Sequence, residues 1–281
     1  GWRSDRFDWR TFFHPDSEKF SSPIVVTLLR TCNLDILVTQ RKLIHQLELE
    51  IDSGTSWALL GRNGTGKTSL LHTLAKLKPA AAGEIFLKGE SLTELGGKSL
   101  ARRIGLLFQQ GLPVMPKTVS EAAMLGRYPH HQSLWRDDPE DITVVEDALR
   151  DFDLTHLSAR SIQTLSGGEA QRLALAQLVA QAPSLYLLDE PSNHLDLAHQ
   201  LRGLRRLKSK VTSQRAALMM ASHDINLVSQ ICDHVLLLMG DGTYLAWPVG
   251  KILQEDNLSE AFECRIRRVE SGQEAFFFPS T

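Results

Sequence analysis

The stretch that decides the fold is Gly61-Arg62-Asn63-Gly64-Thr65-Gly66-Lys67-Thr68. It follows an apolar run that predicts a buried strand at Trp57–Leu60, and it leads into a predicted helix that opens at Lys67. Glycines let the backbone curl tightly, so that its N–H groups and the positive end of the helix point at phosphate oxygens. The sequence therefore predicts a phosphate-binding loop between a strand and a helix.

Two side chains of this loop have specific predicted roles. We expect Lys67 to reach the β and γ phosphates of a nucleotide and Thr68 to ligate magnesium. The remaining nucleotide contacts are predicted for Gly61, Arg62, Asn63, Gly64, Thr65, Gly66 and Ser69.

A second buried strand, predicted at Leu185–Leu188, ends in two carboxylates. We expect Asp189 to hold the magnesium ion, directly or through water, because a phosphate-binding loop needs a carboxylate on a neighbouring strand for this purpose. The adjacent Glu190 is the candidate to orient or deprotonate the attacking water. Together the two stretches indicate a nucleotide hydrolase.

Composition bounds the class of protein. The 281 residues are 42% hydrophobic and 23% charged with a formal net charge of -2, which excludes a disordered chain and a strongly basic nucleic-acid coat. No apolar run approaches the roughly 20 residues of a membrane span. We interpret one basic run as a solvated helix face rather than a nucleic-acid site, because no aromatic residues interleave with Arg202, Arg205, Arg206, Lys208, Lys210 and Arg215.

Short apolar runs alternate with helical patterns from residue 24 onward, which predicts a mainly parallel sheet covered by helices. Besides the two strands above, we expect strands at Ile104–Phe108, Ala216–Ser222 and Val235–Met239. Residues 1–23 form an aromatic-rich extension, residues 111–164 a helical insertion and residues 240–281 a small β-rich tail of the predicted domain 24–281.

The stretch Leu165–Arg172 reads LSGGEAQR, and its Ser166 lies 23 residues before Asp189. Ser166 is a good N-cap for an Ala- and Leu-rich helix, and Gly167 and Gly168 expose backbone N–H groups at its positive end. This end is a second predicted phosphate-binding surface. The two phosphate-binding surfaces could act on one nucleotide if two copies of the chain pack head to tail, each closing the nucleotide of the other.

In this order and spacing, the chain resembles the ATP-binding cassette (ABC) ATPases. The resemblance covers about residues 28–239 and makes Leu165–Arg172 the signature motif, Gln109 the Q-loop glutamine and a magnesium ligand, Asp196 the D-loop aspartate and His223 the switch histidine. It implies an α/β fold with a P-loop NTPase (RecA-like) core, an N-terminal antiparallel β part and an inserted helical subdomain. It further implies ATP and Mg²⁺ as cofactors and a second copy of the chain as partner.

Two stretches resemble importers of iron-siderophore, haem and cobalamin chelates, namely Leu125–His130 and Asp256–Ser259. This branch implies an ATPase that drives a transmembrane permease, works indirectly with a substrate-binding protein, and sits on the cytoplasmic face of the membrane through the permease. We do not expect His130 and His131 to bind metal, because no further ligands follow at useful spacing.

The sequence leaves two alternative functions open. Residues 190–196 also resemble translation-factor members of the family, which gives a soluble ATPase acting on ribosomes or an assembly scaffold as the alternative. Those members usually carry two cassettes in one chain, whereas this sequence has one, so we prefer the importer. A regulator that binds ATP without hydrolysis is less consistent with the complete catalytic set.

One departure from the family concerns the base. Val38 stands where family members usually have an aromatic residue that stacks on adenine. We expect weak discrimination between ATP and GTP unless another aromatic residue, for example from residues 1–23, takes over.

Overall fold

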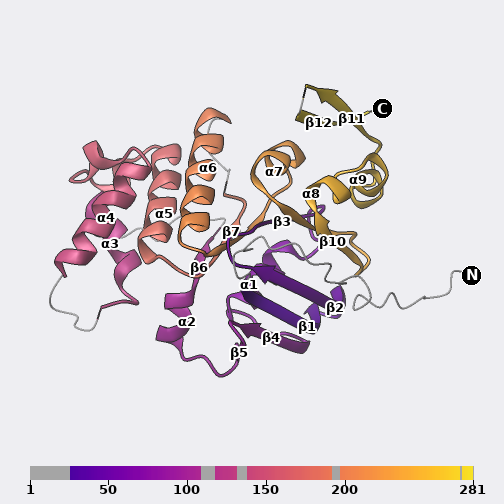
Figure 1. Ribbon diagram of the computed structural model, residues 1–281, viewed down its shortest axis with the longest axis horizontal. Coiled ribbons are helices and arrows are strands. Elements are labelled where there is room, and N and C mark those ends of the chain that lie inside the picture. Colours follow the sequence, from indigo (N-terminus) through magenta and orange to yellow (C-terminus); the bar gives the residue numbers. More distant parts are fainter. Residues whose placement is uncertain (1–25, 109–117, 132–137, 192–196, 273, 281) are drawn as a thin grey trace, which may run out of the picture.

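The computed structural model describes residues 26–108, 118–131, 138–191, 197–272 and 274–280 (Figure 1). Its strands are β1 (Thr27–Val38), β2 (Arg41–Asp52), β3 (Ser56–Leu60), β4 (Ala82–Leu87), β5 (Glu90–Ser91), β6 (Ile104–Leu107), β7 (Leu185–Asp189), β8 (Ala217–Ala221), β9 (His234–Leu238), β10 (Tyr244–Pro248), β11 (Ile266–Ser271) and β12 (Glu274–Pro279). Its longer helices are α1 (Lys67–Leu74), α2 (Gly97–Arg103), α3 (Val119–Met124), α4 (Pro139–Asp151), α5 (Gly167–Gln181), α6 (Leu197–Ser213), α7 (Ile225–Ile231), α8 (Val249–Ile252) and α9 (Glu255–Phe262).

A six-stranded sheet forms the centre of the molecule, in the order β10-β9-β3-β8-β7-β6. The five strands from β9 to β6 are parallel, and β10 pairs with β9 in antiparallel fashion. All residues of β3, β7 and β8 are buried, as continuous apolar runs predict for strands covered on both faces. The predicted mainly parallel sheet is therefore confirmed, with strand ends that differ by a residue or so.

Alternation along β3 divides the core into two hydrophobic clusters. Ala58 and Leu60 face the cluster that includes residues of α3 to α7, whereas Trp57 and Leu59 face the cluster that includes α1 and the second sheet. That second sheet is antiparallel in the order β2-β1-β4-β5, and it is the predicted N-terminal antiparallel part. Helix α1 contacts both β1 and β7, so it lies between the two sheets (Figure 1).

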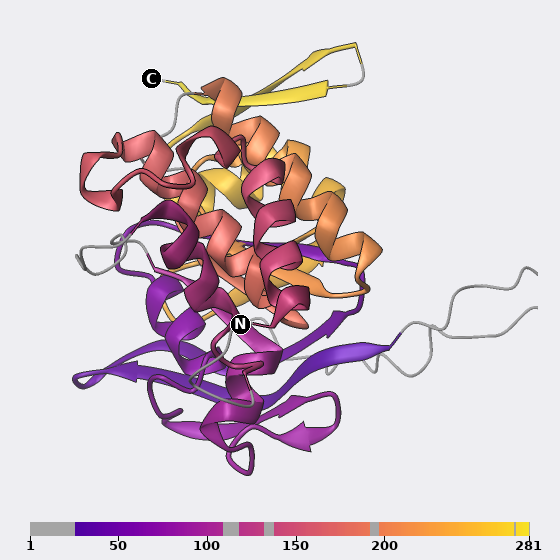
Figure 2. The same cartoon turned by 90° about the vertical axis from the view of Figure 1, so that its left-hand side faces the viewer.

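The segment between β6 and β7 is helical where the structure describes it, as the sequence predicts. Helix α3 begins with a capping box, in which Thr118 and Glu121 satisfy each other's backbone N–H groups. Helix α4 begins at Pro139 after the N-cap Asp138. In the described part of this segment, the 3₁₀ turn Leu125–Arg127 (η2) lies between α3 and α4, and the turns Thr155–Leu157 (η3) and Ile162–Thr164 (η4) lie between α4 and α5. The helices form one group beside the central sheet, with the four-stranded sheet at the opposite end from the C-terminal hairpin (Figure 2).

The last forty residues differ in detail from the sequence-based prediction. Strand β10 belongs to the central sheet, and the two helices α8 and α9 precede the β11–β12 hairpin. Both helices are short, four and eight residues, so they leave little periodic signal in the sequence. The aromatic extension 1–23 lies outside the described residues. Within the described part of the chain, no helix combines the length and apolar character needed to span a membrane.

Candidate nucleotide site

Two of the three predicted catalytic residues, Glu190 and His223, lie at the carboxyl edge of the central sheet, and the third, Gln109, lies outside the described residues. Strands β3, β8 and β7 are neighbours, and Ala221 pairs with both Leu59 and Asp189. The loop after β3, the carboxylates at the end of β7 and His223 after β8 therefore share one edge of the sheet. Ligands of open parallel sheets bind at this edge.

The phosphate-binding loop needs glycine at two of its positions for visible steric reasons. Gly61 has φ +148°, and a Cβ atom there would lie 2.8 Å from Thr65 Oγ1 and 2.9 Å from the Leu238 carbonyl oxygen. Gly66 has φ +109°, and a Cβ atom there would lie 3.0 Å from Leu43 Cβ. The curled backbone leads directly into α1 at Lys67, which places the positive end of the helix at the loop.

Lys67 lies inside this loop and is 6% exposed. Its Nζ atom donates hydrogen bonds to the carbonyl oxygens of Gly61 at 2.7 Å and Arg62 at 3.0 Å. Burial lowers the pKa of Lys67 below its ordinary value, and the nearby charges of Glu190 and Asp189 oppose that shift. A buried cation at the centre of a curled backbone is suited to bind phosphate oxygens.

Asp189 is 2% exposed, and burial raises the pKa of its carboxyl group, while a hydrogen bond with the Thr68 side chain opposes the shift. The Oδ2 atom of Asp189 is buried and finds no hydrogen-bond partner among the described residues. An unpaired buried carboxylate oxygen beside a hydroxyl fits a hard divalent cation, because such cations prefer oxygen ligands. Thr68 and Asp189 therefore fit the magnesium ion that the sequence predicts.

The side chains of Glu190 and His223 lie next to each other. Nδ1 of His223 lies 3.5 Å from Oε1 of Glu190, and the side chains are 60% and 14% exposed. Glu190 has φ +50°, which is uncommon for a residue other than glycine, and its backbone N–H donates to the Ala221 carbonyl at 3.1 Å. Pairing across the sheet thus holds Glu190 at the strand edge in a costly conformation, as is frequent at functional sites.

One open cavity of about 940 Å³ contains most of these groups. Its lining includes the predicted Gly61, Arg62, Asn63, Gly64, Gly66, Lys67, Thr68, Ser69, Glu190 and His223. Val38 also lines the cavity, together with three residues that the sequence did not indicate, namely Arg41, Leu43 and Phe262. Leu43 packs against Gly66, a contact that the sequence alone does not reveal. Phe262 comes from the C-terminal helix α9, more than 190 residues from the loop.

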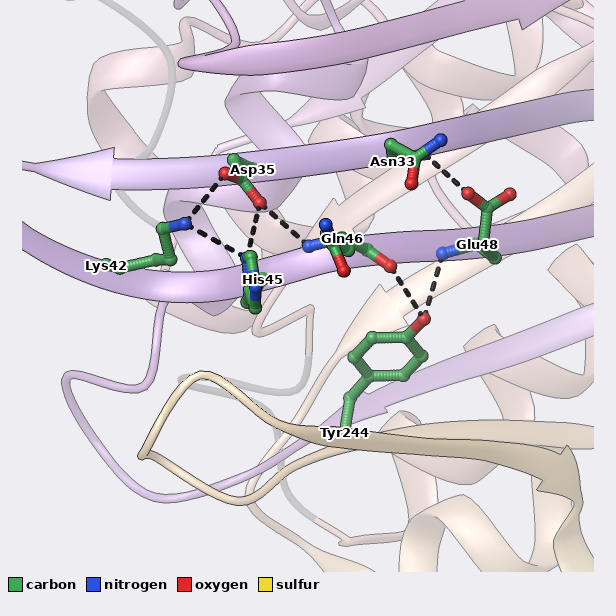
Figure 3. Close-up of polar contacts among 7 residues, drawn as sticks. All are labelled: Asn33, Asp35, Lys42, His45, Gln46, Glu48 and Tyr244. Atoms are coloured by element: carbon green, nitrogen blue, oxygen red, sulfur yellow. Dashed lines mark hydrogen bonds and ion pairs between the residues drawn. The ribbon is translucent and has the colours of Figure 1, made fainter. Parts of the chain in front are cut away.

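Polar contacts hold the β1–β2 hairpin, which carries Val38, against the central sheet (Figure 3). The Tyr244 hydroxyl of β10 donates to the Gln46 carbonyl at 3.1 Å and accepts from the Glu48 N–H at 2.9 Å. Within the hairpin, the Asp35 carboxylate accepts from the Gln46 N–H at 2.7 Å and pairs with Lys42 at 2.9 Å. These two contacts hold the pKa of Asp35 well below its usual range.

The signature stretch begins α5 as predicted, with a capping box. Ser166 Oγ accepts from the Glu169 N–H at 3.3 Å, and the Glu169 carboxylate accepts from the Ser166 N–H at 2.7 Å. Ser166 and Gly167 are exposed, and residues 166–168 do not line the cavity that contains Lys67. The Gln171 side chain donates to the Pro191 carbonyl at 2.9 Å, so α5 contacts the loop that follows Glu190.

Gln109 and Asp196 lie outside the described residues, so their predicted roles stay predictions. The His130 ring hydrogen-bonds to the Gln181 carbonyl at 2.8 Å, and His131 pairs with Asp141 at 3.1 Å. No group of three metal-ligating side chains occurs in the described ranges.

Four cations of the basic run on α6 have partners within the chain. Arg205 contacts Gln230, Arg206 pairs with Asp153, Lys208 with Asp233 and Lys210 with Asp151.

Residues 44–193 match the protein family described as ABC transporter. The chain is 38% identical over 194 residues to the ferric enterobactin transport ATP-binding protein FepC of Escherichia coli (strain K12), covering 69% of this chain and 72% of that protein. It is 34% identical over 244 residues to the hemin import ATP-binding protein HmuV of Pseudomonas fluorescens (strain Pf0-1), covering 85% and 94%. A solved metal-chelate type ABC transporter, in an inward-facing conformation, gives a TM-score of 0.78 at 27% identity, covering 91% of this chain and 98% of that chain.

The fold and the site thus define a P-loop ATPase. The chain belongs to the ABC transporter family, as the motifs of its sequence predict.

Proposed function

We propose that this chain is the ATP-hydrolysing subunit of an importer for a metal chelate of the iron-siderophore, haem or cobalamin type. The observation that carries the proposal is the cavity itself, in which the phosphate-binding loop, Glu190 and His223 lie together. The names of the relatives support the class of cargo, because one is a ferric enterobactin transport protein and another a hemin import protein.

The side chains suggest a division of labour in hydrolysis. Lys67 exchanges its two carbonyl contacts for phosphate oxygens when ATP binds. Glu190 orients the attacking water and accepts its proton while the water oxygen bonds to the γ phosphorus and the bond to the β–γ bridging oxygen breaks. We assign the contact with the γ phosphate to His223, which is mostly exposed and lies 3.5 Å from Glu190. The products are ADP and inorganic phosphate.

A candidate magnesium site lies beside these residues. Thr68 and Asp189 supply a hydroxyl and a buried carboxylate oxygen, and Gln109 is the predicted third ligand. When bound there, Mg²⁺ would neutralise charge that develops on the phosphate oxygens.

The exposed start of α5 supports a head-to-tail dimer of this chain. Ser166, Gly167 and Gly168 form the N-terminal end of α5, where backbone N–H groups suit phosphate oxygens, and they do not line the cavity of their own chain. We propose that they close over the ATP bound to Lys67 of a second copy, which makes ATP the ligand that joins two copies.

A second exposed surface is our candidate for the permease contact. Phe108, Leu125 and Tyr128 are 50%, 45% and 60% exposed, which is high for large apolar side chains. The Phe108 ring lies edge-on to the His72 ring of α1, with 5.8 Å between centroids, and α1 begins at Lys67. Arg102 and Lys98 of α2 donate to the Pro129 and His131 carbonyls, so α2 holds the segment that follows η2.

Membrane recovery with and without the permease tests this proposal. We expect the chain to be peripheral on the cytoplasmic face of the membrane and to co-purify with membranes only when its permease is co-expressed. Tyr128→Glu should uncouple transport while basal ATP hydrolysis stays normal, because Tyr128 lies outside the nucleotide cavity. Val269→Glu is the matched control, since Val269 is 48% exposed on the distant β11–β12 hairpin.

Equal membrane recovery without the permease would contradict the proposal. Association with ribosomes alone would favour the soluble ATPase that residues 190–196 also suggest.

A further inference from the structure

The lining of the nucleotide cavity contains two chemically different groups of residues. Residues 61–64 and 66–69 offer backbone N–H groups and the Lys67 cation, which suit a triphosphate, and Glu190 and His223 lie with them in the lining. The other lining residues are Val38, Arg41, Leu43 and Phe262, of which three are apolar. An aromatic base is suited to this second group, because it gains from apolar contact and stacking.

Phe262 is the sole Phe, Tyr or Trp among the described residues that line this cavity. Position 38, on the β1–β2 hairpin, is a valine that is 42% exposed. A valine side chain offers apolar contact but no π face, so stacking on a base must come from elsewhere. Phe262 is the described candidate.

Packing holds Phe262 at the edge of the cavity. It is the last residue of α9, whose Leu258 and Ala261 are fully buried, and its own ring packs against the main hydrophobic cluster. Two further residues of α9 bind strand β11. Ser259 Oγ accepts from the Ile266 N–H at 2.9 Å, and the Glu255 carboxylate accepts from the Arg268 N–H at 2.7 Å.

A chain of polar contacts connects the end of α9 to the phosphate-binding loop. Glu263, directly after Phe262, has φ +51° and forms an ion pair with Arg62 of the loop. The Arg62 guanidinium lies against Gly240, where a Cβ atom would be 3.2 Å from its Nη2 atom. The Gly240 carbonyl in turn accepts from Arg41 at 3.0 Å. These contacts link α9, the phosphate-binding loop, the β9–β10 turn and the β1–β2 hairpin.

We propose that Phe262 is the aromatic platform for the adenine ring of ATP, in place of the residue at position 38. The Arg62–Glu263 ion pair and the buried face of α9 position the platform. The inference rests on the proposed function, because it assumes that the triphosphate occupies the loop. It makes the C-terminal helix part of the substrate site and the source of base preference.

Binding of ATP and of inorganic triphosphate to the full-length chain tests the platform, since only ATP carries the base. Phe262→Leu keeps an apolar side chain but removes the ring. We expect this variant to bind ATP about 5- to 100-fold more weakly, as for loss of one stacked base, and to bind triphosphate with unchanged affinity. Val38→Tyr, added to Phe262→Leu, should restore at least half of the lost ATP affinity on a logarithmic scale.

Phe278→Leu is the matched control, because Phe278 is an exposed phenylalanine of β12 that does not line the cavity. It should change neither affinity. The ratio of the two affinities is insensitive to a partial loss of folded protein, since unfolding lowers both apparent affinities alike. Phe262→Leu with the wild-type ratio would overturn the inference and leave the ATPase assignment intact. A wild-type chain that binds neither ligand would instead overturn the proposed function.

Discussion

Lys67→Ala removes the only side-chain cation that the described structure places inside the curl of the phosphate-binding loop. Lys67 Nζ makes two short hydrogen bonds, at 2.7 and 3.0 Å, and ATP binding transfers this charge to phosphate oxygens. A hydrogen bond to a charged group contributes about 1.5 to 3 kcal/mol, which corresponds to roughly 10- to 150-fold in affinity.

Calorimetric titration with ATP, with and without magnesium, measures this effect directly. Hydrolysis should fall below detection, and thermal unfolding without nucleotide should change by only a few degrees. Lys67→Arg is a useful companion, because it keeps the charge but cannot fit the same compact ammonium geometry. ATP affinity within threefold of wild type in Lys67→Ala, together with normal hydrolysis, would refute the assignment of the loop.

Two further predictions concern the contacts that hold the β1–β2 hairpin. Tyr244→Phe loses the hydrogen bonds to Gln46 and Glu48, so urea unfolding should show a loss of about 1 to 2 kcal/mol, and an unchanged midpoint would show that these bonds do not stabilise the fold. Asp35 has its pKa lowered from the ordinary 3.8, mainly by the Gln46 N–H and then by Lys42, so its charge stabilises the fold above that pH. Asp35→Asn should therefore be about 1 kcal/mol less stable at pH 7, with the difference shrinking as pH falls below about 4; a pH-independent difference would contradict this.

Much of the site follows from local sequence, because its parts sit at the ends of buried parallel strands. The loop at 61–68, the carboxylates after Leu188 and the capped helix at Ser166 each need specific residue types at fixed spacing, and the structure has them in the predicted elements. Strand pairing then brings the end of β7 beside the end of β3 through β8.

The residues that the sequence did not indicate depend on contacts between distant segments. Phe262 lines the cavity because α9 packs its Leu258 and Ala261 into the core, and no local pattern encodes that placement. Arg62 fits the motif by position, but its pairing with Glu263 becomes visible only in three dimensions. The helices α8 and α9 were not predicted because four and eight residues are too few for a clear period.

The size of the Glu190→Gln variant with and without magnesium ATP tests whether Glu190 activates water and whether two copies of the chain close over ATP. Glutamine keeps the shape of the side chain that faces His223 but loses the charge that activates water. We predict that this variant binds ATP, loses most of its turnover, and elutes from a sizing column as a dimer only when magnesium ATP is present. A variant that stays monomeric with bound ATP while hydrolysing normally would contradict both the catalytic role of Glu190 and the closure of two copies over the nucleotide.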